Sequence, residues 1–342
     1  MLVRYAPTSP GPHEAGRRDE PNRGTDPVGG NSTRILVLNY NGRELLGECL
    51  PSVVEAARRS PVPCRVTVVD NGSTDGSLET LARDWPGVGV EVEPNRGLAS
   101  FNVALARMAE PVVLLLNNDV KLAPDAVGPL LETFDRHPDA LFAAPACWTF
   151  DGLEYEGMRT RVRTRFGLVQ GLCRVPGHEA WVDRPDLTAS AGPVLAVDRS
   201  KFLALGGYHP IYFPGRIEDL DLGFRGWMAG WRGYYVPESV AYHKGFGSFG
   251  PAFGRAGCDL LAARNTLLFA WKNLCGPRLA AHLAWLPARL AFALASRRPG
   301  FALALIEALG RLGEVRRARQ ALAVGRDGWT VRQEAFFQRF HF

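Results

Sequence analysis

Three carboxylates lie within four positions of the segment GRIEDLDLGFRGWMAGW, residues 215–231. They belong to Glu218, Asp219 and Asp221. A carboxylate that comes within about 3 Å of a hydroxyl group can remove its proton, so one of them could serve as a general base. Asp221 precedes Arg225 by four residues, which predicts a structural ion pair on a helix. Glu218 and Asp219 are therefore the candidates for chemistry.

The same segment predicts a helix with one apolar stripe, made of Leu220, Phe224, Trp227 and Trp231. Gly223 and Gly226 lie on the face that carries Asp219, and Gly230 follows as a C-terminal cap. Each interior glycine costs a helix about 1 kcal/mol relative to alanine, so these two require a reason. Two explanations are open from the segment alone: a neighbouring element packs closely on the glycines, or a substrate approaches there.

The elements that must position these acids begin at residue 34, where short aliphatic runs alternate with helical patterns. The predicted strands are residues 34–41, 65–74, 90–97 and 111–119, and the predicted helices are 43–59, 77–84, 99–108 and 125–137. This order predicts an α/β fold with a mostly parallel sheet, right-handed crossovers and helices on both faces. Ligands of such sheets bind beyond the carboxyl ends of the strands.

Three polar clusters lie at those carboxyl ends: Asn39-Tyr40-Asn41, Asp70-Asn71-Gly72-Ser73 and Asn117-Asn118-Asp119. One cluster would be ordinary turn chemistry, whereas three at one edge indicate a binding site. The aliphatic run before the third cluster predicts a strand buried on both faces, which brings Asp119 to the edge of the sheet. Mg²⁺ and Mn²⁺ accept one or two carboxylates plus substrate phosphates, so Asp119 is a candidate metal ligand.

Several common site motifs are absent from the sequence. There is no G-x-x-x-x-G-K-[ST] loop, no G-x-S-x-G, and no G-x-G-x-x-G after the first predicted strand, where a dinucleotide-binding fold carries it. The sequence therefore does not support a P-loop NTPase, a dinucleotide-binding fold or the usual α/β-hydrolase. Its six cysteines show neither C-x-x-C nor the spacing of a zinc site, which predicts a reducing, cytoplasmic setting.

The two ends of the chain differ in composition from its middle. With 342 residues and 46% hydrophobic side chains, the chain can bury a large core. Residues 1–33 are rich in proline, glycine and charge and lack an apolar signal-peptide core, which predicts a disordered tail. Residues 276–342 carry 11 Arg and no Lys against 4 acids, a net charge of +7 in a chain of net charge +5.

The Arg-rich segment predicts amphipathic helices that do not cross a membrane. Its apolar runs are interrupted by Pro287, Arg289 and Arg297-Arg298-Pro299 before they reach the roughly 18–20 residues of a span. Two interpretations fit equally: helices lying on the inner face of the plasma membrane, with Arg toward anionic headgroups, or a helical hairpin packed on the main domain. Because the arginines alternate with Leu and Ala rather than with stacking aromatics, nucleic acid is not expected as a partner.

Seven motifs, in one order along the chain, resemble the family 2 glycosyltransferases of the GT-A fold, and more narrowly their bacterial rhamnosyltransferase-type members. They are LNYNG, VVDNGSTDGS, EPNRGLASFNVA, LLLNNDV, SAGPVLAVDRSKFLALGGY, IEDLDLGFRGWMAGWRGYYVPESVAYHKG and RNTLLFAWKN. They cover about residues 34–275. The resemblance implies a GT-A domain over residues 34–275, followed by an Arg-rich amphipathic helical extension over residues 276–342.

The resemblance implies a donor site for a sugar linked to a pyrimidine nucleoside diphosphate, UDP or dTDP. Asp70 would accept a hydrogen bond from the pyrimidine, and Asn39 and the Asn71-Gly72 turn would frame the base. The segment after the third predicted strand would complete the donor site. Its matching residues are Asn95, Arg96, Gly97 and Asn102.

The resemblance also implies a divalent metal, Mg²⁺ or Mn²⁺, beside the donor diphosphate. Asp119 matches the last acid of the DxD-type motif, whose first two positions are here Asn117 and Asn118. One carboxylate remains at this motif, although Asn carbonyl oxygens such as that of Asn118 can also ligate. His243, in VAYHKG, resembles the histidine that completes the metal shell in some members.

Asp219 resembles the catalytic base of inverting members, which takes the proton from the acceptor hydroxyl. Glu218 would orient the acceptor, and Gly223 and Gly226 would keep this helix face open to a sugar. The helix dipole and the metal charge would keep Asp219 ionised at neutral pH. The glycine- and phenylalanine-rich segment at residues 243–257 would fold over the substrate.

Three functions compete for these features. The leading one is an inverting, metal-dependent glycosyltransferase that moves a sugar, with rhamnose suggested by the motifs, to a hydroxyl of a polysaccharide or lipid-linked glycan. A sugar-phosphate nucleotidyltransferase normally has a glycine-rich, Lys/Arg-containing loop after the first strand, which NYNGRELL does not resemble. A sugar-nucleotide-binding protein with a decayed catalytic site is favoured by the paired asparagines before Asp119.

Overall fold

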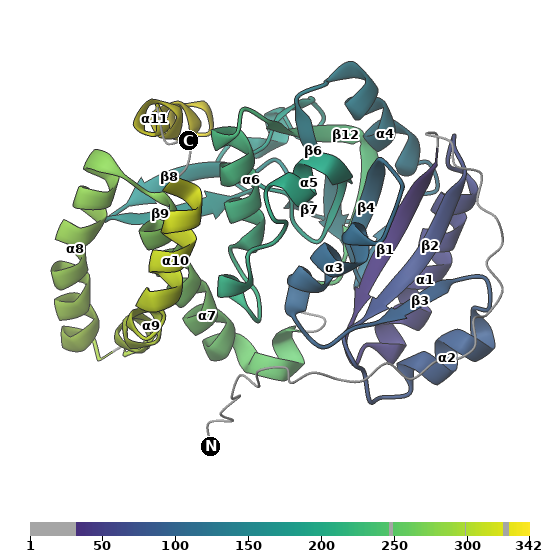
Figure 1. Cartoon of the computed structure of the whole chain (residues 1–342), viewed down its shortest axis with the longest axis horizontal. Coiled ribbons are helices and arrows are strands. Elements are labelled where there is room, and N and C mark those ends of the chain that lie inside the picture. Colours follow the sequence, from purple (N-terminus) through teal and green to yellow (C-terminus); the bar gives the residue numbers. More distant parts are fainter. Residues whose placement is uncertain (1–31, 246–248, 298, 324–327) are drawn as a thin grey trace. The chain divides into compact units, whose positions relative to one another are not determined.

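The computed structural model describes residues 32–245, 249–297, 299–323 and 328–342. The tail predicted over residues 1–33 lies outside these ranges apart from its last two positions, as do residues 246–248 of the predicted substrate-covering segment. The described residues belong to one compact unit (Figure 1).

The first third of the chain builds four parallel strands. They lie in the order β4 (Val112–Asn117), β1 (Thr33–Asn39), β2 (Cys64–Asp70) and β3 (Gly89–Val92). Their crossovers are α1 (Arg43–Arg58), α2 (Ser77–Asp84) and α3 (Ser100–Ala106), the last preceded by a short 3-10 turn at Gly97–Ala99. The predicted alternation of strands and helices is therefore confirmed. The register places Asn39 beside Asp70 and Leu38 beside Asn117, so three polar strand ends meet at one edge.

The rest of the chain extends this sheet with strands of mixed direction. β11 (Val194–Asp198) is antiparallel to β4 and to β6 (Ala140–Thr149), and β12 (Arg232–His243) is parallel to β6. Three short strands add to β12 and β6: β5 (Val120–Leu122), β7 (Tyr155–Gly157) and β10 (Asp186–Leu187). A separate hairpin is formed by β8 (Arg161–Arg165) and β9 (Leu168–Leu172).

Helices cover the sheet because its central strands are apolar on both faces. The consecutive residues Leu36 and Val37 of β1, and Leu115 and Leu116 of β4, are at most 2% exposed, the pattern of strands that are buried on both sides. α4 (Val127–Arg136) packs on β6 and β12, and α5 (Arg199–Ala204) packs on β11. The strand predicted to run to residue 119 ends at Asn117, because Asn118 and Asp119 form the turn into β5.

The acidic segment forms α6 (Glu218–Met228), with the predicted apolar stripe against a second core. Leu220 and Phe224 are buried, and Trp227 packs edge-on against Phe336 of α11 (Trp329–Arg339) and Phe340 just after it. Gly230 adopts φ +93° just after the helix, as predicted for its cap. Trp231 lies beyond the helix end and packs on the sheet core instead.

The two interior glycines of α6 serve close packing. A Cβ at Gly223 would lie 2.1 Å from the backbone oxygen of Ala189, and one at Gly226 would lie 2.4 Å from Cδ2 of Leu141. Such distances are far inside van der Waals contact, so larger residues cannot fit without displacing the neighbours. The prediction that these glycines keep a face open to a sugar is therefore wrong. Protein atoms fill that side of the helix.

The C-terminal helices pack on the main domain and on one another. α7 (Phe249–Asn273) contacts α9 (Gly300–Leu309) and α10 (Leu312–Ala323), α8 (Gly276–Ala295) contacts α9, and α11 contacts α6. Ala304 and Ala308 are the buried contacts of α9. Figure 1 shows α8 at the end of the unit opposite α2. α9 and α10 therefore pack against α7. No helix in the described ranges has the length and apolar character to cross a membrane.

Candidate functional site

Buried polar side chains join the carboxyl ends of β4, β1 and β2. Asn118 Nδ2 donates to Asn39 Oδ1 (2.7 Å), and Asn39 Nδ2 donates to Asp70 Oδ2 (2.8 Å). The backbone N–H and the hydroxyl of Ser73 also donate to the Asp70 carboxylate, at 2.7 and 2.8 Å. Asp70 thus accepts three protein hydrogen bonds and has capacity for about one more, the one predicted for the pyrimidine. The network fixes the three strand ends relative to one another.

The predicted donor segment lies beside the end of β2. Asn71 Nδ2 donates to the carbonyl of Gly97 (3.3 Å), and Asn95 Oδ1 accepts from the Gly97 N–H (3.0 Å). Gly72 and Gly97 both have positive φ, 77° and 57°. A Cβ at Gly97 would lie 2.9 Å from the carbonyl oxygen of Pro214, so glycine permits this loop to approach the chain that leads into α6.

Asn102 occupies a different place from the other donor-site candidates. Its Oδ1 accepts from the backbone N–H of Tyr208 (2.9 Å), and its Nδ2 donates to the carbonyls of Tyr208 (2.9 Å) and Gly206 (3.4 Å). Both amide hydrogens are therefore used by the Gly206–Tyr208 turn. The structure brings Asn102 to this turn rather than to Asp70 and the strand ends.

Asp119 and His243 lie together, as the metal-site prediction requires. Asp119 is 5% exposed, and its Oδ1 is enclosed without a hydrogen-bond partner in the described part of the chain. His243 Nε2 lies 3.4 Å from Asp119 Oδ2, because β12 pairs His243 with Val120. Glu156 Oε2 lies 2.7 Å from His243 Nδ1. No sequence signal pointed to Glu156, since it is isolated in a short strand of no recognisable motif.

These residues fit a divalent cation in two respects. An orphaned carboxylate oxygen is available on Asp119, and a metal-bound histidine characteristically has a carboxylate on its other ring nitrogen, as Glu156 provides. Burial lowers the pKa of His243, but its bonds to Asp119 and Glu156 outweigh burial and raise the pKa to about 9. A metal must therefore displace a proton from His243. In the described ranges no three His, Cys, Asp or Glu side chains gather as a metal cluster, so phosphates and water would complete the shell.

A strained turn leads into the acidic end of α6. Arg216 and Ile217 have φ of 80° and 75°, in the left-handed region that L residues rarely adopt. Asn265 of α7 holds this turn through hydrogen bonds from Nδ2 to the carbonyls of Tyr212, Gly215 and Arg216, at 2.7–2.9 Å. Strain of this kind persists only where the surroundings impose it. The RNTLLFAWKN motif thus fixes the position of the acids.

Glu218 and Asp219 present enclosed, unpartnered oxygens. Glu218 is 8% exposed, and neither Glu218 Oε2 nor Asp219 Oδ1 has a hydrogen-bond partner among the described residues. Burial raises the pKa of Glu218 to about 7. Burial, and then the charge of Glu218, raises the pKa of Asp219 well above its ordinary value. The expectation that the helix dipole favours the ionised form of Asp219 is not met in the protein alone, because desolvation outweighs the helix N-terminus and raises the pKa. A carboxylate with a raised pKa is a stronger base.

A small pocket joins the donor segment to the acids. Arg96 and Leu98 line one part of it, and Tyr208, Phe213 and Glu218 line another. The two predicted groups of residues, separated by more than a hundred positions in the sequence, therefore meet at one small pocket of about 10 Å³.

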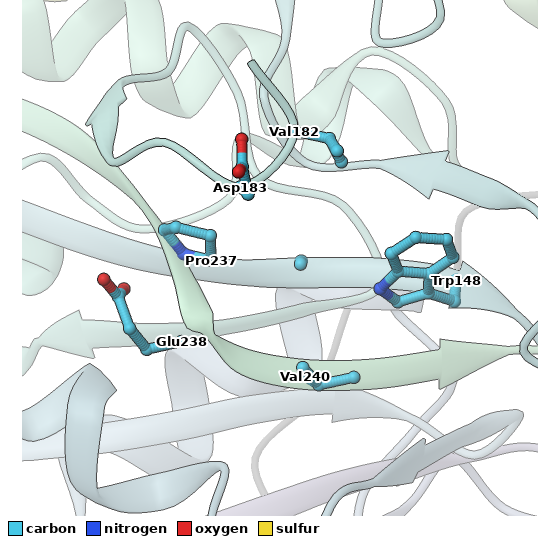
Figure 2. A pocket seen from close by; sticks show the side chains of 7 residues that line it. Trp148, Val182, Asp183, Pro237, Glu238 and Val240 are labelled. Carbon is cyan, nitrogen blue, oxygen red and sulfur yellow. The ribbon is translucent and has the colours of Figure 1, made fainter. Parts of the chain in front are cut away.

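A second pocket, of about 240 Å³, lies at an irregularity of β12 near Pro237 and Glu238. Figure 2 shows it with Trp148, Val182 and Asp183 on its walls. None of the predicted site residues lines this pocket, so it has no part in the proposed chemistry.

Asp221 has the structural role predicted for it. Its Oδ2 accepts from Arg225 Nε (2.7 Å), and its Oδ1 accepts from Lys272 Nζ (2.6 Å), Asn273 (2.7 Å) and the hydroxyl of Tyr212 (2.8 Å). Burial would raise the pKa of Asp221, but the two cations hold it far below its usual range. Burial lowers the pKa of Lys272 to about 8. The spacing in the sequence indicated Arg225, whereas no local pattern pointed to Lys272.

The known proteins similar to this chain are consistent with the site. A family model described as Glycosyl transferase family 2 matches residues 34–180. An N-acetylglucosaminyl-diphospho-decaprenol L-rhamnosyltransferase of Mycobacterium tuberculosis is 29% identical over 266 residues, 69% of this chain and 82% of that protein. A putative polypeptide N-acetylgalactosaminyltransferase 10 of Drosophila melanogaster is 25% identical over 234 residues, 63% of this chain and 36% of that protein.

A solved structure shares the architecture. The crystal structure of GalNAc-T7 with UDP, GalNAc and Mn²⁺ matches at a TM-score of 0.50 and 17% identity, over 79% of this chain and 58% of that one. At this identity the likeness shows the fold, a mostly parallel sheet flanked by helices of the GT-A type. Together with the motif order and the sequence matches it leads to one conclusion: residues 34–180 match the glycosyl transferase family 2 model, and the chain is similar to a rhamnosyltransferase.

Proposed function

We propose that the protein is an inverting glycosyltransferase that uses a pyrimidine nucleotide-diphosphate sugar and transfers the sugar, rhamnose in the first instance, to a hydroxyl of a lipid-linked or polysaccharide glycan. One observation carries the proposal: the pocket that Arg96 of the donor segment shares with Glu218, next to Asp219. A donor site and a candidate base on one cavity are what transfer to an acceptor requires.

In this reaction the acceptor oxygen forms a bond to the anomeric carbon as the bond from that carbon to the diphosphate breaks. The leaving nucleoside diphosphate keeps the electron pair, and Asp219 Oδ1 takes the proton of the acceptor hydroxyl. Glu218 orients the acceptor from the same helix start. Asp70, with Asn39 and Asn71 around it, receives the pyrimidine. The M. tuberculosis relative is named for transfer to a diphospho-decaprenol-linked sugar, which supports a lipid-linked acceptor.

Asp119 and His243 would hold the divalent cation, with Glu156 orienting the histidine. When bound, such a cation supplies positive charge to the diphosphate as negative charge develops on it. The GalNAc-T7 crystal structure, which contains Mn²⁺ together with UDP, supports this assignment.

Thermal stability with UDP, dTDP, GDP and CDP, each with Mn²⁺, Mg²⁺ or EDTA, tests the donor site. A ligand at 100 times its dissociation constant adds roughly 2.7 kcal/mol to the free energy of unfolding, which is readily measured. We expect UDP or dTDP to stabilise the wild type in the presence of metal and to lose this effect in Asp119→Ala. Turnover then separates an enzyme from a binding protein: nucleotide binding with no transfer in any acceptor mixture would support a decayed site instead.

An exposed apolar surface is formed by the outer side chains of α8 and α9. Phe292 is 73% exposed, Leu294 is 62% exposed and Ile306 is 65% exposed. The other large apolar side chains exposed on these helices are Leu283, Trp285, Leu303 and Leu309. Large apolar side chains exposed in this number on two neighbouring helices indicate an interaction site, here called the α8–α9 surface.

We assign the α8–α9 surface to the headgroup region of an anionic membrane on the cytoplasmic side. Exposed arginines follow both helices, Arg297 after α8 and Arg316 and Arg317 in α10, and residues 276–342 carry a net charge of +7. Arginine beside an apolar helix face is complementary to anionic headgroups, and tryptophan suits the interface at which Trp285 would lie. Peripheral attachment would bring the pocket to lipid-linked acceptors.

Flotation with phosphatidylglycerol–phosphatidylcholine vesicles tests this assignment against phosphatidylcholine alone. We expect the wild type to float with the anionic vesicles, and the double variant Phe292→Ser, Leu294→Ser to stay in solution. Val331→Ser in α11, which removes an apolar side chain that is 72% exposed, is the matched control and should float as the wild type does. If the double variant instead floats normally and loses a dimer seen by light scattering, the surface belongs to a second copy of the chain.

A further inference from the structure

The loop that leads into α6 is held through its backbone carbonyls. It comprises residues 211–217 and ends at the acidic pair, Glu218 and Asp219. Five of its seven carbonyls accept hydrogen bonds from side chains of α7 and of the C-terminal extension, residues 276–342. They are the carbonyls of Ile211, Tyr212, Phe213, Gly215 and Arg216. The place of the acids therefore depends on segments that follow them in the chain.

Two of the donors are neighbours in α7. Asn265 binds three of the carbonyls through Nδ2. Arg264 is 5% exposed, and its Nη2 donates to the carbonyl of Phe213 at 2.7 Å. Its Nε donates to Asn265 Oδ1 at 2.9 Å. This bond orients the amide of Asn265, because the oxygen faces Arg264 and the nitrogen then faces the loop.

The third donor belongs to the C-terminal extension. Arg311 lies in the turn between α9 and α10, and its Nη1 donates at 2.9 Å to the carbonyl of Ile211, one hundred positions earlier in the chain. Glu307 of α9 also reaches this region, with its Oε2 3.6 Å from Arg264 Nη1. Because α9 packs on α7, the extension thus holds the loop directly and also contacts a second residue that holds it.

The loop requires this support because it is strained where it meets the helix. Arg216 and Ile217 both have φ in the left-handed region, and backbone of this kind persists only where its surroundings impose it. If its carbonyls are released, the loop can relax toward ordinary φ, which moves the helix start and both acids. A displacement of about 1 Å at a reacting group can cost about 100-fold in rate.

We propose that Arg311 is a positioning residue for glycosyl transfer: by holding the carbonyl of Ile211 it fixes the start of α6, so that Asp219 meets the acceptor hydroxyl. Arg264 acts in the same way at the carbonyl of Phe213. The C-terminal extension thereby contributes to transfer itself, besides the membrane contact proposed for the α8–α9 surface. This inference rests on the proposed role of Asp219 as the base.

Arg319 provides a matched control in the same extension. It lies in α10, and its Nη1 donates to the carbonyls of Trp271 (2.6 Å) and Leu274 (2.8 Å) at the C-terminal end of α7. Arg311→Ala and Arg319→Ala thus each remove a guanidinium group that binds backbone carbonyls. The two changes differ in whether those carbonyls belong to the loop before the acids.

The experiment measures kcat with dTDP-rhamnose as donor and an N-acetylglucosaminyl-diphospho-lipid as acceptor, and the dissociation constant of dTDP with Mn²⁺, for full-length variants. We expect Arg311→Ala to lower kcat about 10- to 100-fold. The dissociation constant of dTDP should stay unchanged, because the proposed nucleotide contacts, Asp70 and Asn39, lie at the strand ends. Arg311→Lys keeps a charged donor for the carbonyl and should retain a higher kcat than Arg311→Ala. Arg319→Ala should keep the kcat of the wild type.

Melting curves establish that each variant is folded. A wild-type kcat in Arg311→Ala would overturn the inference, as would an equal fall of kcat in Arg319→Ala. Equal rates in Arg311→Lys and Arg311→Ala would refute the hydrogen bond as the cause. Weaker binding of dTDP at unchanged kcat would assign Arg311 to the support of the donor site and refute the role given to it here.

Asp219→Asn separates this inference from the proposed function. Transfer at the wild-type rate by Asp219→Asn would remove the proposed base itself. An inactive Asp219→Asn beside an unaffected Arg311→Ala would refute only the positioning role of Arg311.

Discussion

Replacing Glu218 by glutamine should make the protein more stable at pH 8 and should slow the transfer reaction. The carboxylate is 8% exposed, and its Oε2 has no hydrogen-bond partner within the described part of the chain. Its neighbours offset only part of the cost of burial, since Arg216 attracts the ionised form and Asp221 repels it. An ionised group in such a place destabilises the fold, and glutamine keeps the shape without the charge.

The size of the effect follows from the pKa of Glu218, which burial raises from 4.5 to about 7. The folded state binds this proton more tightly than the unfolded state. Protonation of Glu218 therefore stabilises the folded protein fully below pH 4.5, and this stabilisation is lost as the pH rises through about 7. The ionisable carboxyl group of Glu218 then lowers the free energy of unfolding by about 3 kcal/mol at pH 8 and by about 1 kcal/mol at pH 5, relative to a group that stays neutral. The stability of Glu218→Gln relative to the wild type should therefore increase by about 2 kcal/mol over this range, roughly 4 °C in Tm.

Thermal unfolding at pH 5, 6, 7 and 8 measures this difference, and the change with pH is the quantity of interest. Glu79→Gln is the matched control. Both glutamates lie in the first turn of a helix, Glu79 in α2 and Glu218 in α6, but Glu79 is exposed and Glu218 is buried. Transfer rates on the same samples should fall about tenfold or more in Glu218→Gln, the loss expected when a charged hydrogen-bonding group no longer orients the acceptor.

A stability difference that stays constant with pH would refute this reasoning, as would a Glu218→Gln variant that loses stability relative to the wild type as the pH rises. Either result would mean that Glu218 is ionised and well partnered in the folded protein. A stabilised variant with an undiminished transfer rate would keep the electrostatic account and remove Glu218 from the reaction.

Further predictions concern packing, the buried ion pair and the metal site. Gly223→Ala should lower the free energy of unfolding in urea by about 1–3 kcal/mol, because the added Cβ would lie 2.1 Å from a backbone oxygen. Gly47→Ala in α1 is the control, and it should be neutral or stabilising because no atom lies within 4 Å of the added Cβ. Equal effects of the two substitutions would contradict the conclusion that Gly223 is required for packing. Lys272→Met should cost about 3–5 kcal/mol, because it leaves the buried Asp221 with one cation, and an unchanged denaturation midpoint would contradict this. Glu156→Gln should weaken Mn²⁺ binding about 10- to 100-fold in titration calorimetry with UDP present, and an unchanged dissociation constant would detach Glu156 from the site.

The local pattern of the chain determined most of the sheet and the edge at which the site lies. Aliphatic runs such as the one before Asp119 predict buried strands. Because a helix follows each of these strands, the sequence predicts that they pair in parallel, as they do in the structure. Once the strands are parallel, residues at their ends must meet. The side chains of Asn39, Asp70 and Asn118 are joined in the structure for this reason.

What the sequence could not determine depends on neighbours that are distant along the chain. The glycines of α6 suit both an open face and a packed one, and only the approach of Ala189 and Leu141 decides between them. Asn102 could reach a donor or a turn, and the fold places Tyr208 against it from 106 positions away. Glu156 acquires a role only because β7 and β12 both pair with β6 and bring it to His243.

The protonation of the acids also belongs to the tertiary structure. A helix start predicts that Asp219 is ionised, because the sequence shows the helix but not what encloses it. Burial removes water from Glu218 and Asp219, and desolvation of a charge outweighs the partial charge of a helix end. Periodicity is local and can be read along the chain, whereas enclosure arises only when separate segments come together. The sequence therefore indicated the strand ends and the start of α6 as candidate positions, and the fold determined the surroundings of their side chains.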